Sequence, residues 1–505
     1  MRAATIQAVV SIAVLAAAGV RADDATAELA KFRQCADRRI AEIRATPSIP
    51  VPRSAPCYYV SANAGDDASD GRTPQTAWKT AARLAGEKIA PGSFVLFERG
   101  GLYRGTVNVA PGVMYTAYGT GPKPVIYGSP ENGADSAKWT RTDNPCVWAY
   151  DIGHEDVGTL VFDDGKQHAI KIVIRTDKET GRPFNKFTGK PFASFRDLDT
   201  DLHFWHDYKK DGTGKVYLYS RENPGKRFKS IEFNVRRRGF AVGRANGVTI
   251  DNFTVKYAGW HGVGAGECRN LTVSNCEFGW IGGSIQAEGI FGRDYPTRFG
   301  NAVEIYGGCE NFTVTNCYVY QVYDAGLSQQ YGTREKDGLT RHDQKNVRYA
   351  NNVIEKCNYS IEYFLNARKT PGNPSRIENF VIEDNLMFDA GVGFCEQRPD
   401  HNQAAHIKSW YAPERNRAKG YFVRRNALCR SNEMLVQICS TLTNEDGSSS
   451  MPELMDNVFI GHAGDQFGTI SEHSGERETF AAATQASVEK FGTGNRCLVL
   501  PKRTW

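Results

Sequence analysis

From residue 246 onward, short runs of alternating apolar and polar residues recur without helical spacing between them. The copies read NGVTIDNFTVKYAGWHGVGAG, RNLTVSNCEFGWIGG, ENFTVTNCYVYQVYDAGLSQQ, KNVRYANNVIEKCNYSIEYF and ENFVIEDNLMFDAGVGFCEQ, and then, more weakly, YFVRRNALCRSNEMLVQIC and PELMDNVFIGHAG. Each copy holds a short β-branched strand, an asparagine, a second strand, a small-residue turn and a third strand. Three strands in each step of roughly twenty residues predict a parallel β-helix, whose rungs stack about 4.8 Å apart.

An asparagine recurs at the same phase of this repeat. Its seven occurrences are Asn252, Asn275, Asn316, Asn352, Asn385, Asn426 and Asn457. An asparagine side chain both donates and accepts hydrogen bonds, so a stack of them can satisfy the inward-facing backbone groups of one corner. The alternative is that asparagine only marks turns. Cys276 and Cys317 share this phase, which indicates small stacked residues rather than a zinc site.

The segment YYVSANAGDDASDGRTPQTAWKTAARLAGEKIAPGSFVLFERGGLYRGTV, residues 58–107, precedes the repeat. It resembles the entry segment of secreted right-handed parallel β-helix (pectin-lyase-like) proteins that act on polysaccharides. The resemblance implies an all-β, right-handed solenoid whose open end is capped by a helix, as an exposed strand edge requires. It implies no single reaction, because this fold hosts glycoside hydrolases, polysaccharide lyases and epimerases.

The remaining segments complete the predicted organisation. Residues 1–22 combine Arg2, an apolar run too short to span a bilayer and a small-residue site before Asp23, which is typical of a signal peptide and predicts a secreted or periplasmic protein. The further boundaries are a helical segment at 23–56, a capping segment with the first rungs at 57–153, inserted antiparallel β-structure at 154–235, the main solenoid at 236–465 and a C-terminal cap at 466–505.

Composition narrows the partners. The 505 residues carry a formal net charge of +5 and no basic tract, which disfavours nucleic acid, and no later apolar run is long enough to cross a membrane. We expect a monomer. The twelve cysteines can form disulfides in an exported chain, and Cys35 with Cys57 is one conceivable pair. No cofactor is expected. The acidic loop at 65–71 could hold calcium, but it lacks the EF-hand pattern and fits a hydrogen-bonded turn better.

Aligning the third strands of successive copies predicts the chemistry. This alignment places an apolar column inward, made of Val263, Val303, Leu327, Ile361 and Val392. The next residue on each strand points outward, which gives the column Gly264, Glu304, Ser328, Glu362 and Gly393. Two glutamates thus lie two rungs apart on one solvent-facing side, and Asp324 lies on the turn into the rung between them. The glycines, which have no side chain, would leave room for a polysaccharide chain. Asp389 occupies the same phase as Asp324, so one of these two can be a turn acid.

The longest interruptions of the repeat, at 281–300, 331–344, 366–376 and 396–418, flank this strand and predict a loop-walled cleft. The predicted catalytic residues are Glu304, Asp324 and Glu362. The predicted substrate-binding residues are Trp260, His261, Trp280, Arg298, Ser328, Gln330, His342 and Arg368. Further sugar-binding residue types on the loops are Arg293, Tyr295, His401, His406, Trp410 and Tyr411.

Three functions follow from this arrangement. Glycoside hydrolysis needs two carboxyl groups, and Glu304 with Glu362 at roughly 9–10 Å fits inversion, whereas Glu304 with the nearer Asp324 fits retention. Lyase or epimerase chemistry on a uronic-acid polymer needs a basic side chain, and the outward column contains no Lys or Arg. A non-catalytic carbohydrate-binding protein would keep the aromatic loops without paired acids. The sequence favours the hydrolase.

Overall fold

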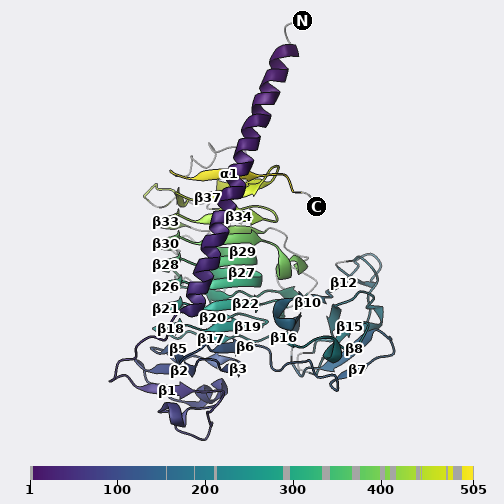
Figure 1. The fold of residues 1–505 in the computed structure, drawn as a ribbon, viewed down its shortest axis with the longest axis vertical. Helices are drawn as coiled ribbons and strands as arrows, with labels where there is room; N and C mark the ends of the chain where they lie inside the picture. Colours follow the sequence, from purple (N-terminus) through teal and green to yellow (C-terminus); the bar gives the residue numbers. More distant parts are fainter. Residues whose placement is uncertain are drawn as a thin grey trace.

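The computed structural model describes residues 4–154, 156–186, 188–209, 213–287, 296–332, 342–366, 376–398, 404–409, 417–439, 444, 446–473, 476–481 and 492–503. Its body is a parallel β-helix in which short strands stack rung upon rung along one axis (Figure 1). The predicted all-β solenoid is confirmed.

Three parallel faces enclose the core. The first is a ten-stranded sheet of β1 (Cys57–Val60), β2 (Phe94–Glu98), β5 (Met114–Tyr118), β18 (Val248–Asp251), β21 (Cys268–Ser274), β26 (Cys309–Thr315), β28 (Gln344–Ala350), β30 (Ile377–Glu383), β33 (Ala418–Arg424) and β36 (Glu453–Met455). The other two faces are joined into one sheet, because β27 (Tyr318–Gly332) and β29 (Val353–Asn366) each run round the corner between them.

The second face contains β4 (Val107–Asn108), β17 (Phe240–Gly243), β20 (Val263–Ala265), β25 (Val303–Tyr306), the later halves of β27 and β29, β32 (Ala405–Ser409), β35 (Val436–Cys439) and β38 (Gln466–His473), with β39 (Glu476–Ala481) antiparallel to β38. The third contains β3 (Leu102–Arg104), β6 (Val125–Tyr127), β19 (Thr254–Lys256), β22 (Glu277–Ile281), the earlier halves of β27 and β29, β31 (Leu386–Ala390), β34 (Ala427–Ser431), β37 (Val458–His462) and β40 (Arg496–Leu500).

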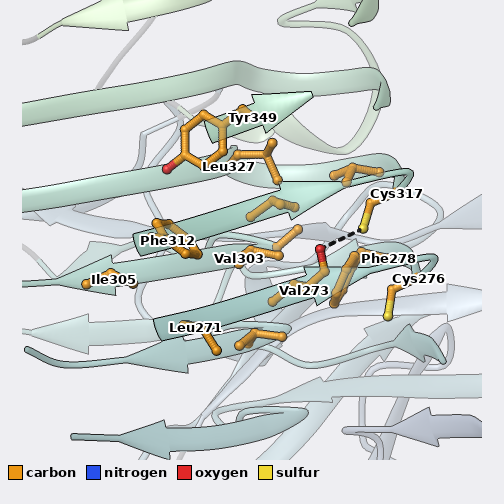
Figure 2. Close-up of a cluster of buried hydrophobic side chains, with 14 of the residues drawn as sticks. Leu271, Val273, Cys276, Phe278, Val303, Ile305, Phe312, Cys317, Leu327 and Tyr349 are labelled. Atoms are coloured by element: carbon orange, nitrogen blue, oxygen red, sulfur yellow. Dashed lines mark hydrogen bonds between the residues drawn. The ribbon is translucent and has the colours of Figure 1, made fainter. Parts of the chain in front are cut away.

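Apolar side chains from all three faces fill the interior. Val303 pairs in register with Val263 on one side and Leu327 on the other, so like residues stack on like along the axis. Figure 2 shows Val303 and Leu327 with Phe312 and Tyr349, packed between the faces. Burying one such side chain contributes about 1.5–3 kcal/mol, and the stacking repeats this gain at every rung.

The asparagine ladder exists, but the predicted set mixes two columns. Four of the predicted residues and one further asparagine form the buried stack, which comprises Asn352, Asn385, Asn426, Asn457 and Asn495. In each step the side-chain oxygen accepts from the amide and the backbone N–H of the asparagine before it, while the side-chain amide also donates to a backbone carbonyl. The two earlier positions of this column hold Cys276 and Cys317, as the small-residue interpretation predicted, and the Cys317 thiol donates to the Val273 carbonyl (Figure 2).

Asn252, Asn275 and Asn316 stand one residue earlier, at the corner itself. Their φ angles are 71°, 51° and 51°, in the left-handed region that asparagine tolerates better than most residues. A second, exposed asparagine ladder that the sequence analysis missed runs along the first sheet. It consists of Asn270, Asn311, Asn346 and Asn379, all with left-handed φ, and each donates its amide to the oxygen of the one before.

We expect Asn426→Leu to lower the stability of the solenoid strongly. The Asn426 oxygen accepts from the Asn385 backbone N–H, and its amide donates to the Ile382 carbonyl, so leucine leaves buried groups without partners, at about 1–3 kcal/mol each. The matched control is Asn311→Gly in the exposed ladder, where glycine adopts the left-handed φ freely and the loss should stay below about 1 kcal/mol. Denaturant unfolding compares the two, and equal midpoints would contradict an energetic role for the buried ladder.

Helix α1 (Ala4–Ala45) lies along the outside of the third face, across successive rungs (Figure 1). Ala36, Ile40 and Ile43 are buried against outward side chains of that face, among them Phe388 and Ile460. Its charged side chains add ion pairs to the same face, Arg44 to Glu277 at 2.8 Å and Arg33 to Glu355 at 2.6 Å. The helix thus covers a side of the solenoid. Among the described residues, no helix has an apolar stretch that could cross a membrane.

The cysteine tether suggested for this helix does not form. Cys35 and Cys57 are both free. The reason is position, because Cys35 packs with the cluster between α1 and the third face, while Cys57 opens β1 in the first rung of the first sheet.

The N-terminal end of the solenoid is closed by residues 58–107, but not by a full helix. The expected helix is a short 3₁₀ segment, Ala81–Gly86, whose Ala81 and Leu84 are buried in the solenoid core. In the acidic loop before it, the Asp67 carboxylate accepts from the backbone N–H groups of Lys79 and Thr80. This is the hydrogen-bonded turn, and among the described residues no group of three or more His, Cys, Asp or Glu side chains is placed to hold a metal ion.

The insertion is built of short, mainly antiparallel strands that lie beside the solenoid (Figure 1). Its elements are β7 (Trp139–Arg141), β8 (Val147–Asp151), β9 (Val157–Phe162), β10 (Gln167–His168), β11 (Ile170–Lys171), β12 (Ile174–Thr176), β13 (Pro183–Asn185), β14 (His203–His206), β15 (Lys215–Tyr219), α2 (Pro224–Arg227) and β16 (Ile231–Val235). The insertion, expected at 154–235, begins earlier, because β7 and β8 belong to the same sheet as β14 and β15. A buried Asp156 contacts Lys171 at 2.5 Å and accepts from the Ile285 N–H, so the insertion is fastened to the solenoid next to the second face.

Candidate active site

The outward column on the second face has the predicted register over four rungs. Gly264, Glu304, Ser328 and Glu362 pair in succession, so the two glutamates are two rungs apart. The fifth member is Lys408, which pairs with Glu362. The prediction of Gly393 at this place, with no Lys or Arg in the column, is wrong.

The error arises from a loop that the repeat pattern hides. After β31 the chain forms the short 3₁₀ helix Gly393–Gln397, and the next strand of the second face begins only at Ala405. The two glycines also leave no open path for a substrate. A Cβ on Gly264 would lie 2.5 Å from the Arg238 Nε, and one on Gly393 would lie 2.5 Å from the Gln321 Oε1.

The column faces outward, yet it is buried, contrary to the expectation of a solvent-facing side. Glu304 is 7% exposed and Glu362 is 2% exposed. Carboxyl groups in such surroundings must be hydrogen-bonded, paired or protonated. Their partners therefore indicate their roles.

Glu304 meets a histidine and an asparagine from adjacent corners. Its Oε2 accepts from the Asn301 side-chain amide at 2.6 Å and lies 3.1 Å from the His261 Nδ1. That same Nδ1 accepts from the Asn301 backbone N–H, at 3.2 Å. Without a proton between them, the Glu304 Oε2 and the His261 Nδ1 would be two hydrogen-bond acceptors in contact. The geometry thus favours one proton shared by Glu304 and His261.

Electrostatics places that proton on the glutamate. Burial raises the Glu304 pKa to about 7, the Asn301 hydrogen bond opposes the rise, Asp324 adds to it and Arg238 opposes it. Burial, aided by Arg238, holds the His261 pKa well below its ordinary value. The pair is therefore no ion pair near neutral pH, because His261 is neutral and Glu304 is protonated about half the time.

This titration predicts a pH-dependent difference in stability between the protein and its Glu304→Gln variant. Because the folded pKa of about 7 exceeds the ordinary 4.5, the stabilisation is complete below pH 4.5 and is lost as the pH rises through 7. The shift corresponds to about 3 kcal/mol. Glutamine does not titrate. Between pH 4.5 and 8 the free energy of unfolding of the variant, relative to that of the native protein, should therefore rise by up to about 3 kcal/mol. Parallel curves in denaturant titrations at several pH values would contradict the raised pKa.

Asp324 is the second carboxyl group near Glu304. It lies within β27, where the register shifts between Val322 and Ala325, and its carboxylate forms a buried ion pair with Arg398. A guanidinium at this distance favours the ionised carboxylate. Two neighbouring carboxyl groups thus have opposed tendencies, Glu304 toward the acid and Asp324 toward the anion.

Asp389, expected to be the counterpart of Asp324, occupies a different column. Asp389 shares its column with Lys356 and Arg430. These three residues directly follow Phe388, Glu355 and Cys429, which pair in register, and each of the three has a left-handed φ angle. The Asp389 carboxylate is bound by Arg430 at 2.8 Å. It is a structural acid at a corner.

The far part of the column is polar. Glu362 accepts from the Gln330 amide at 2.5 Å, and Lys408 donates to the Gln437 side chain in the next rung. The Ser328 hydroxyl, between the two glutamates, is buried without a hydrogen-bond partner among the described residues. It is positioned to bind a group that enters between them.

Aromatic side chains border the column at both strand ends. Trp260, half-buried, lies beside His261 with ring centroids 5.6 Å apart. Tyr306, two residues after Glu304 on the same side of β25, is 43% exposed and contacts the ring of Tyr331. The Tyr331 ring lies tilted against that of His342, with the centroids 4.2 Å apart. Such rings are suited to the apolar faces of sugars.

Three predicted binding residues are packing residues instead. Trp280 is buried in a cluster with Tyr323 and Phe394, at the corner column that also contains Asp389. Arg298 is buried and donates to the carbonyls of Gly283 and Gly158, which joins the solenoid to the insertion. His406 is buried, with its Nδ1 against the Ser360 hydroxyl at 2.9 Å and its Nε2 against the Arg430 carbonyl at 2.9 Å.

Other predicted residues lie outside the described residues, and so does part of each predicted cleft wall. They are Arg293, Tyr295, Arg368, His401, Trp410 and Tyr411. The sequence analysis missed five residues that contact or border the site, namely Arg238, Asn301, Tyr306, Arg398 and Lys408. Asn301 and Tyr306 stand within three residues of Glu304 and were available from that spacing.

Comparisons with known proteins agree with this fold. Residues 238–403 match the family model of the right handed beta helix region. No curated protein matches the chain. XylC, solved in complex with xylose, aligns with 13% identity over 81% of this chain and 76% of its own, at a TM-score of 0.45. The Family 28 exopolygalacturonase of Yersinia enterocolitica aligns with 13% identity over 90% and 81%, at 0.37, and pectate lyase Pel9A with 12% identity over 83% and 76%, at 0.35. The family match shows that residues 238–403, the segment that carries the candidate site, form a right-handed parallel β-helix.

Proposed function

We propose that this protein is a carbohydrate-active enzyme that cleaves a polysaccharide by hydrolysis at Glu304 and Asp324. One observation carries the proposal. Two adjacent carboxyl groups have environments that push their protonation apart, because burial raises the Glu304 pKa to about 7 while Arg398 holds Asp324 toward its anion. Such a pair supplies the acid and the carboxylate that glycoside hydrolysis requires.

The proposed roles follow from these states. Glu304 donates its proton to the glycosidic oxygen as the bond to the sugar carbon breaks. In an inverting reaction the ionised Asp324 removes a proton from the water whose oxygen attacks the sugar carbon. In a retaining reaction Asp324 itself bonds to the sugar carbon, and water then displaces it while the Glu304 carboxylate takes the proton of that water. In both cases one water is consumed, its OH on the sugar carbon and its hydrogen on the leaving oxygen. His261 and Asn301 hold the Glu304 carboxyl in place. Glu362, Ser328 and Gln330 face the next sugar units, and Trp260 and Tyr306 supply apolar surfaces.

Lyase or epimerase chemistry on a uronic-acid polymer is the second candidate, and Lys408 favours it. This lysine is adjacent to Glu362 in the outward column, where the sequence analysis expected no basic residue. A lysine whose pKa is lowered can abstract a proton next to a carboxyl group. The Lys408 Nζ donates to the Gln437 side chain and lies 5.8 Å from the centre of the Tyr359 ring. A buried ammonium group in this position is equally suited to substrate binding.

A panel of neutral, sulfated and uronic polysaccharides tests these proposals. New reducing ends without an ultraviolet-absorbing product support hydrolysis. Reducing ends with an unsaturated product support the lyase. Binding without any product supports a non-catalytic carbohydrate-binding protein and removes the proposed reaction.

We also propose that the protein is exported. The proposal rests on the signal-peptide pattern of residues 1–22. The described part of that segment, from Ala4 on, forms the first part of α1. N-terminal sequencing of the secreted or periplasmic protein should find Asp23 first. An uncleaved chain confined to the cytoplasm would contradict export.

A further inference from the structure

The side chain of Arg238, beside the proposed acid, forms no hydrogen bond or ion pair with any residue that the structure describes. Arg238 lies just before β17, two residues before Phe240. His261 and Asn301 occupy the same position in the next two rungs, because Phe240 pairs in register with Val263, and Val263 with Val303. The Arg238 guanidinium carbon lies 3.7 Å above the centre of the Trp260 ring. The planar cation is therefore held flat on an aromatic surface next to Glu304.

The chain leaves space for this side chain. Arg238 lies over Gly264, the member of the outward column that pairs with Glu304, and a Cβ at that position would come within 2.5 Å of the Arg238 Nε and 2.6 Å of its Cδ. Any other residue at 264 would displace the arginine. The contact explains the glycine and fixes the guanidinium in line with the column.

The positive charge of Arg238 is not matched by a carboxylate. Its Nε has no hydrogen-bond partner, and it takes part in none of the ion pairs formed among the described residues. Glu304 is the carboxyl group whose charge acts on Arg238, and it shares a proton with His261, while Asp324 faces Arg398. Arg236 places a second guanidinium carbon 5.1 Å from the same Trp260 ring, which adds to the local positive charge.

We propose that Arg238 binds an anionic substituent, a carboxylate or a sulfate ester, on the sugar unit next to the bond that Glu304 cleaves. A guanidinium offers two parallel N–H donors to such a group, and the Trp260 ring keeps them oriented. The inference rests on the proposed function, because it names the substrate class of the same site. It makes Arg238 a specificity-determining residue.

Binding measurements on the Glu304→Gln protein separate this inference from the reaction. The probes are oligosaccharides of galacturonate, mannuronate and glucuronate, each beside its form with the carboxyl groups reduced to alcohols, and a sulfated galactan oligosaccharide. Arg238→Gln is added to this background, with Arg238→Lys as the charge-conserving variant. Arg244→Gln, which removes an exposed cation just after β17, is the matched control.

The inference expects an acidic probe to bind at least tenfold more weakly after Arg238→Gln, with partial recovery in Arg238→Lys and no change in Arg244→Gln. The reduced probe should bind equally to all variants. A carboxylate probe and the sulfated probe distinguish the two anions. Equal losses on acidic and reduced probes, or no preference for any acidic probe, would overturn the inference.

Turnover by the protein with Glu304 intact reports separately on the proposed function. Arg238-dependent binding of an acidic probe without cleavage would contradict the hydrolase and leave the anion site standing. Cleavage of neutral chains with an unchanged KM in Arg238→Gln would contradict the anion site and leave the hydrolase standing.

Discussion

Replacing Glu304 with glutamine is expected to lower the turnover of the cleaved polysaccharide by about 10²–10⁴-fold. Glutamine keeps the shape and the contact with Asn301, but it has no proton to give to the leaving oxygen. The matched control is Glu267→Gln, which removes an exposed carboxylate one rung earlier and should leave turnover unchanged. The measurement is the initial rate of reducing-end release by folded proteins at equal concentration.

The pH profile sharpens this result. With Glu304 as the acid, turnover of the native protein should fall as the pH rises through about 7, because the required proton is lost. In Glu304→Gln this alkaline limb should disappear from the residual activity. A folded variant with near-native turnover would exclude Glu304 as the acid and would direct attention to Lys408 and the lyase.

Replacing Arg398 with glutamine is expected to cost about 3–5 kcal/mol of stability. The change removes the cation that faces buried Asp324, and a carboxylate cannot be left charged in such surroundings without a large penalty. The acidic limb of the turnover profile should also move to higher pH, because the Asp324 anion loses the cation that favours it. Denaturant unfolding and the pH dependence of turnover measure the two effects.

Arg430→Gln is the control for this prediction. Its pair with Asp389 is partly exposed at a corner, where an ion pair contributes about 0.2–1 kcal/mol, so stability should change little and the pH profile should not move. Equal effects of the two substitutions would show that Asp324 is as structural as Asp389.

The sequence was sufficient for the fold and for the register of four rungs of the site. Alternation of apolar residues fixes which side chains of a strand point inward, so the pairing of Val263, Val303, Leu327 and Ile361 follows from the pattern alone. The same pattern does not reveal loops. The loop after β31 delays the next strand of the second face, so Lys408 stands in the column where Gly393 was expected.

The asparagines show a second limit. An asparagine at a left-handed corner, such as Asn316, and one in the buried ladder, such as Asn352, are one residue apart in phase, and both are favoured for sound physical reasons. Aligning copies of the repeat that differ by variable insertions does not separate the two kinds of asparagine. Backbone conformation separates them, because only the corner asparagine has a left-handed φ.

Burial was the third limit. Alternation says that Glu304 and Trp280 leave the interior, but not what covers them. In the structure Trp280 is buried beneath the insertion and Glu304 beneath contacts that include His261 and Asn301. Asn301 is a neighbour of Glu304 in the chain, but His261 and the insertion residue Val161, which packs with Trp280, come from distant segments. The pKa that defines the proposed acid arises from the burial that such segments produce.

The masses of the fragments released from a defined oligosaccharide test the central claim most directly. Hydrolysis at Glu304 and Asp324 predicts fragments whose masses sum to that of the parent plus one water, and their loss in Glu304→Gln. Fragments that sum to the mass of the parent alone, with a double bond in one of them, would contradict hydrolysis and establish elimination instead.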